Sequence, residues 1–280
     1  MGSAGQGVPQ GPQPLPGIQY VVAVGSGKGG VGKTTVSVNL AVSLAKLGYR
    51  VGLIDADIYG PNVPTMLGAT RQPRILDGPG GQNLMEPVSS HGVKFISIGL
   101  ISPGDKPMVM RGPMLHQIIR QFLQQVQWGE LDFLVVDLPP GTGDVVISRV
   151  QTVPLTGAVV VSTGSSVALQ DARKALEMFH QVNVEVLGLV ENMSQMTLPD
   201  GTVLDVFGAG GTEQTAKQFG LPFLGSVDMD PQVREGGDRG MPAALGTEGA
   251  RAKEFVAIAE KVVARAKEVA AKSEDVLEIR

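Results

Sequence analysis

One short segment constrains the fold of this chain more than any other. A glycine-rich loop, Gly27-Lys28-Gly29-Gly30-Val31-Gly32-Lys33-Thr34, lies between the β-branched run Tyr20–Val24 and the helix-patterned stretch Thr34–Leu47. Its spacing is G-x-x-x-x-G-K-[ST], in which glycines let backbone N–H groups point at phosphate oxygens. In this pattern Lys33 reaches the β- and γ-phosphates, the Thr34 hydroxyl ligates Mg²⁺, and the positive end of the next helix attracts the same anion. The sequence therefore predicts a strand, a phosphate-binding loop and a helix in direct succession.

Apolar segments of strand type and of helix type alternate along the rest of the chain. The further strand candidates are Arg50–Ile54, Val93–Ile98, Phe133–Val136, Ala158–Val161, Val184–Val190 and Phe223–Val227, and the further helix candidates are Met114–Val126, Ser166–His180 and Glu248–Lys272. Continuous apolar strands separated by helices are typical of a parallel sheet covered on both faces. We therefore expect an α/β fold, a P-loop NTPase with a mostly parallel central sheet flanked by helices on both faces.

The composition along the chain indicates how it is divided. Residues 1–17 are rich in Gly, Pro and Gln, and we expect them to form a flexible leader. Residues 18–280 show no repeat and no second type of composition, so we expect a single P-loop ATPase domain there. The Gly- and Pro-rich stretches 58–92 and 99–113 are interpreted as functional loops.

Charge and cysteine content limit the classes of function. The formal net charge of −4 predicts no general attraction to nucleic acid or to anionic lipid. No apolar run reaches membrane-spanning length and no signal peptide begins the chain, so we expect a cytoplasmic protein without nucleic-acid or membrane partners. The chain contains no cysteine, which excludes disulfides, thiolate metal sites and a cysteine nucleophile within it.

Three aspartates follow strand candidates and are the acidic partners that nucleotide hydrolysis requires. Asp137 ends the run Phe133–Val136, where it is predicted to ligate Mg²⁺ together with Thr34. Asp57 is predicted to orient the attacking water, and Asp55 to belong to the hydration shell of the Mg²⁺ ion. The alternative for Asp55 and Asp57 is that either one caps the following turn, where Asp is favoured.

The loop also contains a second lysine that is more specific than the general pattern. Lys28-Gly29-Gly30-Val31-Gly32-Lys33-Thr34-Thr35 resembles the deviant Walker A signature, K-G-G-x-G-K-[ST]. In the family with this signature, the early lysine reaches across a dimer interface to the partner's nucleotide. The resemblance implies a homodimer with ATP sandwiched at the interface, in which Lys28 and Lys33 are catalytic and the loop through Thr35 binds the nucleotide.

Further motifs extend the resemblance over about residues 18–245. Their order along the chain is Lys28–Thr35, Asp55–Asn62, Arg111–Met114, Asp137–Asp144 and Glu191–Ser194. The chain resembles the Mrp/ApbC-type P-loop ATPases, a group of iron–sulfur cluster carriers related to MinD and ParA. The resemblance implies ATP and Mg²⁺ as cofactors, Asn192 as a residue that reads the adenine edge, and iron–sulfur assembly or client proteins as partners.

The chain departs from this family at the cargo site. The carriers hold a [4Fe–4S] cluster with a C-x-x-C pair after the N-M-S segment, but here the stretch Gln195–Val203 contains no cysteine. Asp200-Gly201 within it is typical of a hairpin turn. The chain could work with a cysteine-bearing partner, could need only ATP-driven dimerisation, or could have had cysteines removed.

Two related functions are alternatives to a carrier. A MinD-like or ParA-like ATP-switched dimer would position itself on membrane or on DNA. The helix Glu248–Lys272 mixes Lys and Glu on its polar side, and the arginines are dispersed, so both alternatives are disfavoured. Arg149 follows the Asp137–Asp144 segment in an apolar setting, and we assign it no role.

Overall fold

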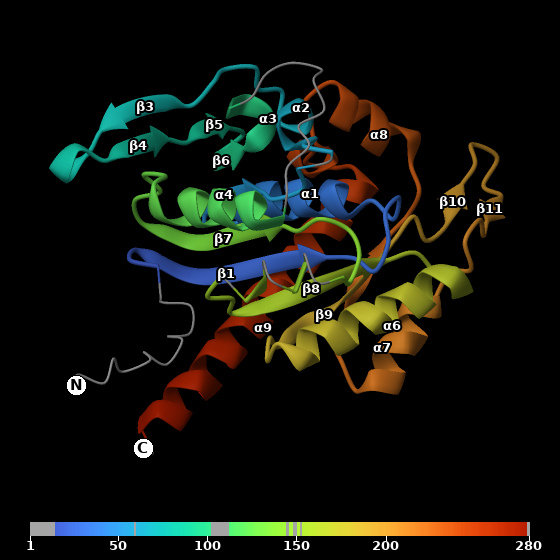
Figure 1. Cartoon of the computed structure of the whole chain (residues 1–280). Coiled ribbons are helices and arrows are strands. Elements are labelled where there is room, and N and C mark those ends of the chain that lie inside the picture. Colours follow the sequence, from blue (N-terminus) through green and yellow to red (C-terminus); the bar gives the residue numbers. More distant parts are fainter. Residues whose placement is uncertain are drawn as a thin grey trace.

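A computed structural model describes residues 15–58, 60–101, 112–143, 146–147, 150–151 and 153–278 of the chain. Its centre is an eight-stranded sheet with the strand order β12-β9-β8-β1-β7-β2-β6-β5 (Figure 1). In chain order these strands are β1 Ile18–Gly25, β2 Val51–Asp55, β5 Val88–Ser90, β6 Val93–Ser97, β7 Leu131–Asp137, β8 Gly157–Ser162, β9 Val186–Asn192 and β12 Phe223–Val227. Every neighbouring pair is parallel except β5 and β6, which confirms the predicted mostly parallel sheet.

Helices cover both faces of this sheet, as the sequence predicts. They are α1 Lys33–Lys46, α2 Val63–Met66, α3 Ile98–Ile101, α4 Gly112–Gln124, α6 Ser166–Gln181, α7 Gly211–Phe219, α8 Pro231–Asp238 and α9 Ala250–Glu278. Two small antiparallel sheets lie outside the central one: β3 Arg74–Asp77 with β4 Asn83–Glu86, and β10 Met196–Thr197 with β11 Val203–Leu204.

Alternate residues of strand β1 belong to two hydrophobic cores, one on each face of the sheet. Tyr20, Val22 and Val24 belong to the core that contains buried residues of α1 and α9. Val21 and Ala23 belong to the opposite core, which contains buried residues of α4, α6 and α7. Successive side chains of a strand point to opposite faces, so a strand covered on both sides must be apolar throughout.

The parallel arrangement brings the predicted site to one edge of the sheet. Val24 pairs with Asp137, and Asp137 pairs with Asp55, so β1, β7 and β2 end at the same level. Strand β9 ends at Asn192 on the same side of the sheet. Ligands of open α/β sheets bind outside these carboxyl ends, and the loop after β1 lies there.

The stretch 58–92 differs from its prediction as a functional loop. It contains α2, the β3–β4 hairpin and β5, which pairs antiparallel with β6. These elements are short, and β3 is largely exposed, so their apolar residues are too few to form a recognisable pattern. Helices α7 and α8 were not predicted for the same reason, since few of their residues are buried.

One further prediction concerns a hairpin turn, and others concern residues that the structure does not describe. Asp200-Gly201 does form the turn of the β10–β11 hairpin, with Gly201 at φ 86°. Residues 1–14 of the predicted leader lie outside the described residues, as do residues 102–111, Asp144 and Arg149.

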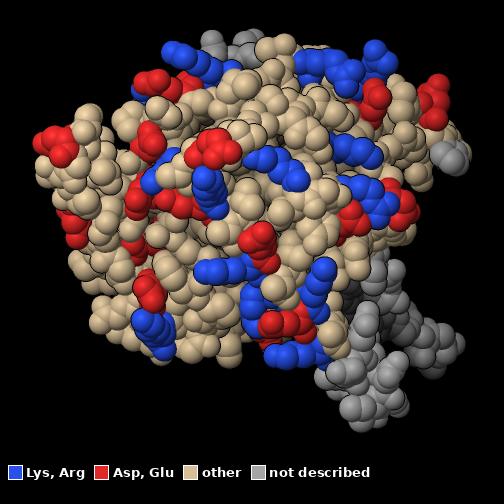
Figure 2. Space-filling view, turned by 180° about the vertical axis from the view of Figure 1, so that it is seen from behind, with Lys and Arg blue, Asp and Glu red and all other residues tan. Residues whose placement is uncertain are grey.

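The surface shows no segregation of charge on the face opposite to that of Figure 1. Lys and Arg are interspersed there with Asp and Glu (Figure 2). In the part of the chain that the structure describes, no helix is long and apolar enough to cross a bilayer.

Candidate functional site

The loop after β1 depends on glycine at two close approaches. At Gly27 an added Cβ would lie 2.0 Å from the carbonyl oxygen of Asp171 in α6. At Gly32, which has φ 80°, an added Cβ would lie 2.1 Å from the Asn192 amide nitrogen. The pattern of glycines therefore has a steric cause: this loop passes directly against α6 and against the end of β9.

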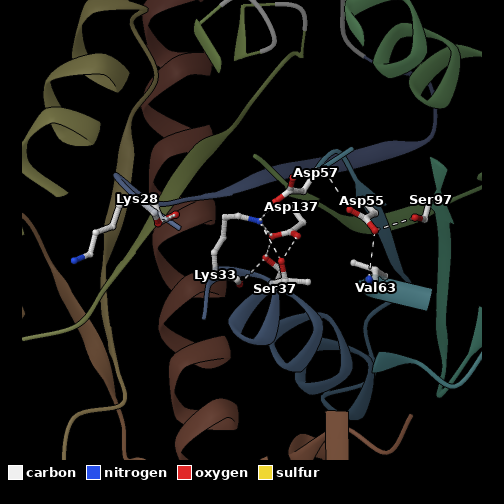
Figure 3. Close-up of polar contacts among 10 residues, drawn as sticks. Lys28, Lys33, Ser37, Asp55, Asp57, Val63, Ser97 and Asp137 are labelled. Carbon is white, nitrogen blue, oxygen red and sulfur yellow. Dashed lines mark hydrogen bonds and ion pairs between the residues drawn. The ribbon is translucent and has the colours of Figure 1, made fainter. Parts of the chain in front are cut away.

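Lys33 is the first residue of α1, and its side chain is buried beside two carboxylates (Figure 3). Its Nζ lies 2.8 Å from Asp137 Oδ1 and 3.6 Å from Asp57 Oδ2. It also donates to Thr34 Oγ1 at 3.2 Å. Burial of an ammonium group is favourable only with such partners, so the two aspartates hold Lys33 at the carboxyl end of the sheet.

Asp137 is fully buried and accepts hydrogen bonds from three side chains of α1. Lys33 Nζ and Ser37 Oγ donate to Oδ1, the latter at 2.6 Å, and Thr34 Oγ1 donates to Oδ2 at 2.8 Å. Together these donors stabilise a charged carboxylate in the interior. Ser37 was missed by the sequence reasoning, although its position one turn after Lys33 in a predicted helix could have indicated it.

Asp55 and Asp57 occupy different environments although they are two residues apart. Asp57 lies on the wall of the cavity in front of the loop, whereas Asp55 is fully buried beneath it. Asp55 accepts hydrogen bonds from Ser97 Oγ at 2.8 Å, from the Asp57 amide at 3.2 Å and from the Val63 amide at 3.3 Å. Burial, and then the nearby charge of Asp137, raise the pKa of Asp55 to about 8.

The structure thus places Asp55 where it holds the start of α2 and the backbone of Asp57. Its assignment to the hydration shell of Mg²⁺ stays a prediction, as does the assignment of Asp57 to the attacking water. Asn192 is nearly buried, and its amide nitrogen donates to the carbonyl oxygen of Val31 at 2.9 Å. That contact supports the loop from below, and the proposed reading of an adenine edge by Asn192 stays a prediction.

A cavity of about 800 Å³ opens in front of the loop, which is a size typical of sites for small ligands. The predicted residues on its wall are Lys28, Gly29, Gly30, Gly32, Lys33, Thr34, Thr35, Asp57 and Asn192. Gly27 and Val31 belong to the same loop, and Asp137 lies behind Lys33. The structure therefore brings nearly all predicted loop residues to one cavity.

Sequence reasoning missed the opposite wall of this cavity. That wall comes from the segment after β12 and from α8, and it includes Asp228, Met229, Asp230, Pro231 and Arg234. Asp230 caps α8 by accepting from the Gln232 amide, and Pro231 is the first helical residue. An Asp followed by Pro is a signal for the start of a helix and could have revealed α8.

The side chain of Lys28 has a different position from that of Lys33. It lines the cavity, but Figure 3 shows it pointing away from Lys33 and the aspartates. It forms no ion pair with any residue that the structure describes. Lys28 is therefore available to a charged group outside this constellation.

The polar groups around the cavity suit the phosphates and the Mg²⁺ ion that the loop pattern predicts. Backbone amides and Lys33 match an anion such as a chain of phosphates. The Thr34 hydroxyl and a nearby carboxylate are hard oxygen ligands, which suit a Mg²⁺ ion that is also held by phosphates and water. The arrangement can therefore accommodate a nucleoside triphosphate with its magnesium ion.

Comparison with known proteins agrees with this geometry. Residues 17–263 match the sequence model of the ParA family, described as NUBPL iron-transfer P-loop NTPase. The chain belongs to this family.

Relatives of this NUBPL-type P-loop NTPase include proteins called iron–sulfur cluster carrier protein. That of Synechocystis is 50% identical over 252 residues, which are 89% of this chain and 71% of the relative. That of Deinococcus radiodurans is 53% identical over 232 residues, 82% of this chain and 65% of the relative. The chain thus spans about two thirds of these bacterial proteins.

A solved structure shares the fold of this NUBPL-type P-loop NTPase. It is a nucleotide-binding protein from Archaeoglobus fulgidus in complex with ADP, with a TM-score of 0.71 and 34% identity. The match covers 82% of this chain and 90% of that protein. The family resemblance and the fold class that the sequence predicts are both confirmed.

Proposed function

We propose that this chain is a Mg²⁺-dependent ATPase that acts in iron–sulfur cluster transfer. The observation that carries the proposal is the convergence of Lys33, Thr34 and Asp57 on one cavity in front of a glycine-rich loop. The family description and the ADP complex of the Archaeoglobus relative support a nucleotide as the ligand.

Each side chain has a task that follows from its position. Lys33 exchanges its contacts with Asp137 and Asp57 for phosphate oxygens and so places its cation beside the transferring phosphoryl group. Asp57, once relieved of that cation, orients a water molecule for attack. Thr34, with Asp137 nearby, would hold Mg²⁺, which would supply positive charge that offsets the charge of the phosphates.

Lys28 and Asn192 complete the proposed site. Lys28 contributes a second cation from a position that is not engaged by the chain's own described carboxylates. This fits a sandwiched homodimer, in which Lys28 serves the nucleotide of the other protomer. Asn192 contributes through the loop that it supports, and its position on the cavity wall also allows contact with the base.

Release of phosphate from Mg²⁺–ATP tests the ATPase proposal. We expect slow turnover by the wild type in the absence of a partner, and a loss of about tenfold or more in Lys33→Ala, because the cation beside the phosphoryl group is removed. Lys174→Ala is the matched control, since Lys174 lies on α6 and pairs only with Asp171 among the described carboxylates. Equal turnover in wild type and Lys33→Ala would reject the proposal.

The cluster itself is cargo that this chain does not hold with thiolates. Its 280 residues include no cysteine, and methionine does not replace an anionic sulfur ligand. We therefore propose that thiolates come from a partner or client protein, with ATP hydrolysis timing the exchange, and that the protein works in the cytoplasm. Anaerobic reconstitution with iron and sulfide should leave the purified chain without visible charge-transfer bands. A stoichiometric bound cluster would show that other ligands suffice.

A further inference from the structure

Ser37 places a fully buried hydroxyl group on α1, one turn after Lys33. A serine inside a helix commonly donates to the carbonyl oxygen four residues earlier, and Ser37 Oγ does lie 3.1 Å from the carbonyl oxygen of Lys33. A shorter contact of 2.6 Å joins the same hydroxyl to Asp137 Oδ1. Because a hydroxyl has one hydrogen and the carboxylate is charged, the hydrogen bond to Asp137 is the stronger of the two.

Ser37 differs from the other donors to Asp137 in its position relative to the cavity. Lys33 and Thr34 line the cavity, whereas Ser37 does not. Figure 3 shows Ser37 beside Asp137, with the hydrogen bond that joins them. The Ser37 hydroxyl therefore acts on a ligand in the cavity only through the carboxylate that it holds.

Binding of a nucleotide changes the set of donors around Asp137. In the proposed function Lys33 moves to phosphate oxygens, so Asp137 Oδ1 loses an ammonium group that lies 2.8 Å away before binding. The Thr34 hydroxyl can bind a metal ion through its oxygen and still donate its hydrogen to Oδ2. Among the described residues, Ser37 is then the side-chain donor that remains at Oδ1. Its hydroxyl fixes the orientation of the carboxylate after Lys33 has left.

We propose that Ser37 is a positioning residue for the Mg²⁺ ion of the bound nucleotide. Its hydrogen bond to Oδ1 holds the Asp137 carboxylate with Oδ2 beside Thr34, the predicted ligand of the ion. The inference rests on the proposed function and deepens it, because that function leaves open what orients Asp137 once Lys33 has moved. Loss of a residue that orients a metal ligand typically lowers metal affinity by about ten- to a hundredfold.

The same helix provides a matched control for this role. Ser43 also belongs to α1 and is also fully buried, but its hydroxyl has no hydrogen-bond partner among the described residues. Burial of a serine on α1 therefore does not by itself require a carboxylate. Ser37→Ala and Ser43→Ala remove the same atom from the same helix, and only the first removes a contact with Asp137.

The affinity for a fluorescent, non-hydrolysable ATP analogue, measured once with Mg²⁺ and once with EDTA, tests the proposal. The ratio of the two affinities is the gain that the ion gives to binding. We expect Ser37→Ala to lower this gain by about tenfold, because Asp137 is no longer held toward the ion. Ser43→Ala should keep the gain of the wild type.

Ser37→Thr separates the hydroxyl from the packing at this position. Threonine keeps a hydroxyl group on Cβ, so we expect it to retain most of the gain that Ser37→Ala loses. Thermal unfolding without nucleotide should leave Ser37→Ala close to Ser43→Ala, since Asp137 still has Lys33 and Thr34 as donors. A gain that Ser37→Thr loses as fully as Ser37→Ala, or a Ser37→Ala chain that unfolds far below Ser43→Ala, would overturn the role of the hydroxyl.

The behaviour of the wild type separates this inference from the proposed function. A wild type that binds no analogue, or binds it equally with Mg²⁺ and with EDTA, overturns the proposed function and the inference with it. A wild type with a clear gain that Ser37→Ala keeps in full overturns the role of Ser37 alone. Equal losses of affinity with Mg²⁺ and with EDTA in Ser37→Ala would also overturn that role, because they would show an effect on the loop and not on the site of the ion.

Discussion

Gly30 and Gly32 have nearly the same backbone conformation, with φ 83° and φ 80°, but different surroundings. An added Cβ at Gly30 meets nothing within 4 Å, whereas at Gly32 it meets the Asn192 amide at 2.1 Å. A side chain at Gly30 would therefore cause backbone strain alone, whereas a side chain at Gly32 would cause the same strain and also a clash with Asn192. Only Gly32 is required both for its conformation and for the approach of β9.

We expect Gly30→Ala to lower the free energy of unfolding by about 1–2 kcal/mol, the strain of a left-handed residue. Gly32→Ala should cost about 1–3 kcal/mol more, because Asn192 must also move. Urea unfolding of both variants measures the difference. In an Asn192→Ala background the extra cost should largely disappear, and equal effects of the two glycine variants would contradict the proposed contact.

The raised pKa of Asp55 predicts a specific dependence of the free energy of unfolding on pH. Its pKa is near 3.8 in an unfolded chain and about 8 in the folded protein, so the folded state binds the proton more tightly. The contribution of this proton binding to the free energy of unfolding is fully present below about pH 4. It is lost as the pH rises to about 8, by on the order of one kcal/mol per pH unit. The variant Asp55→Asn has no titratable group at this position, so it lacks this dependence on pH.

Thermal unfolding of wild type and Asp55→Asn between pH 5 and 9 tests this sign. The stability of the wild type should decline relative to the variant as the pH rises. A difference in stability between wild type and variant that stays constant over this range would show that Asp55 is already ionised in the folded protein.

At the level of elements, the long helix α9 packs its apolar stripe on the sheet and beside α1. Phe255, Ile258 and Val262 are buried in the core that also contains α1 residues. This agrees with the interpretation of the helix as part of its own domain. Because α1 begins with Lys33, α9 packs against the helix that follows the phosphate-binding loop.

Phe255→Ala should therefore lower the free energy of unfolding by about 3–5 kcal/mol, since a fully buried aromatic ring is replaced by a cavity. Glu260→Ala on the exposed side of α9 is the control and should change it by less than about 0.5 kcal/mol. Guanidinium unfolding measures both. A small effect of Phe255→Ala would show that α9 packs loosely.

At the level of the whole molecule, the cavity lies between the loop, the end of β9 and the segment leading into α8. A ligand bound there contacts segments far apart in the sequence and binds only the folded chain. Mg²⁺–ATP at about one hundred times its Kd should add about 2.7 kcal/mol to the stability. The midpoint of thermal unfolding should rise accordingly in the wild type and in Lys174→Ala, but not in Lys33→Ala. A rise of the same size in Lys33→Ala would place the nucleotide elsewhere.

Strong local patterns made much of this protein predictable. Buried parallel strands are apolar throughout, and α1, α4, α6 and α9 have helical periodicity, so these elements were recognised within a few residues. Short or polar elements such as α7, α8 and the β3–β4 hairpin were not, because their stability comes from contacts with distant segments and not from a local pattern.

The sequence by itself determined the phosphate-binding loop, the α/β class and the absence of thiolate ligands, since each depends on the types and spacing of neighbouring residues. Only the tertiary structure decided that Asp55 is buried while Asp57 faces the cavity, that Ser37 contacts Asp137, and that Asn192 supports the phosphate-binding loop. Those relations depend on which strand ends meet at one edge of the sheet. Strand order is set by packing across the whole chain, so no local stretch of residues contains it.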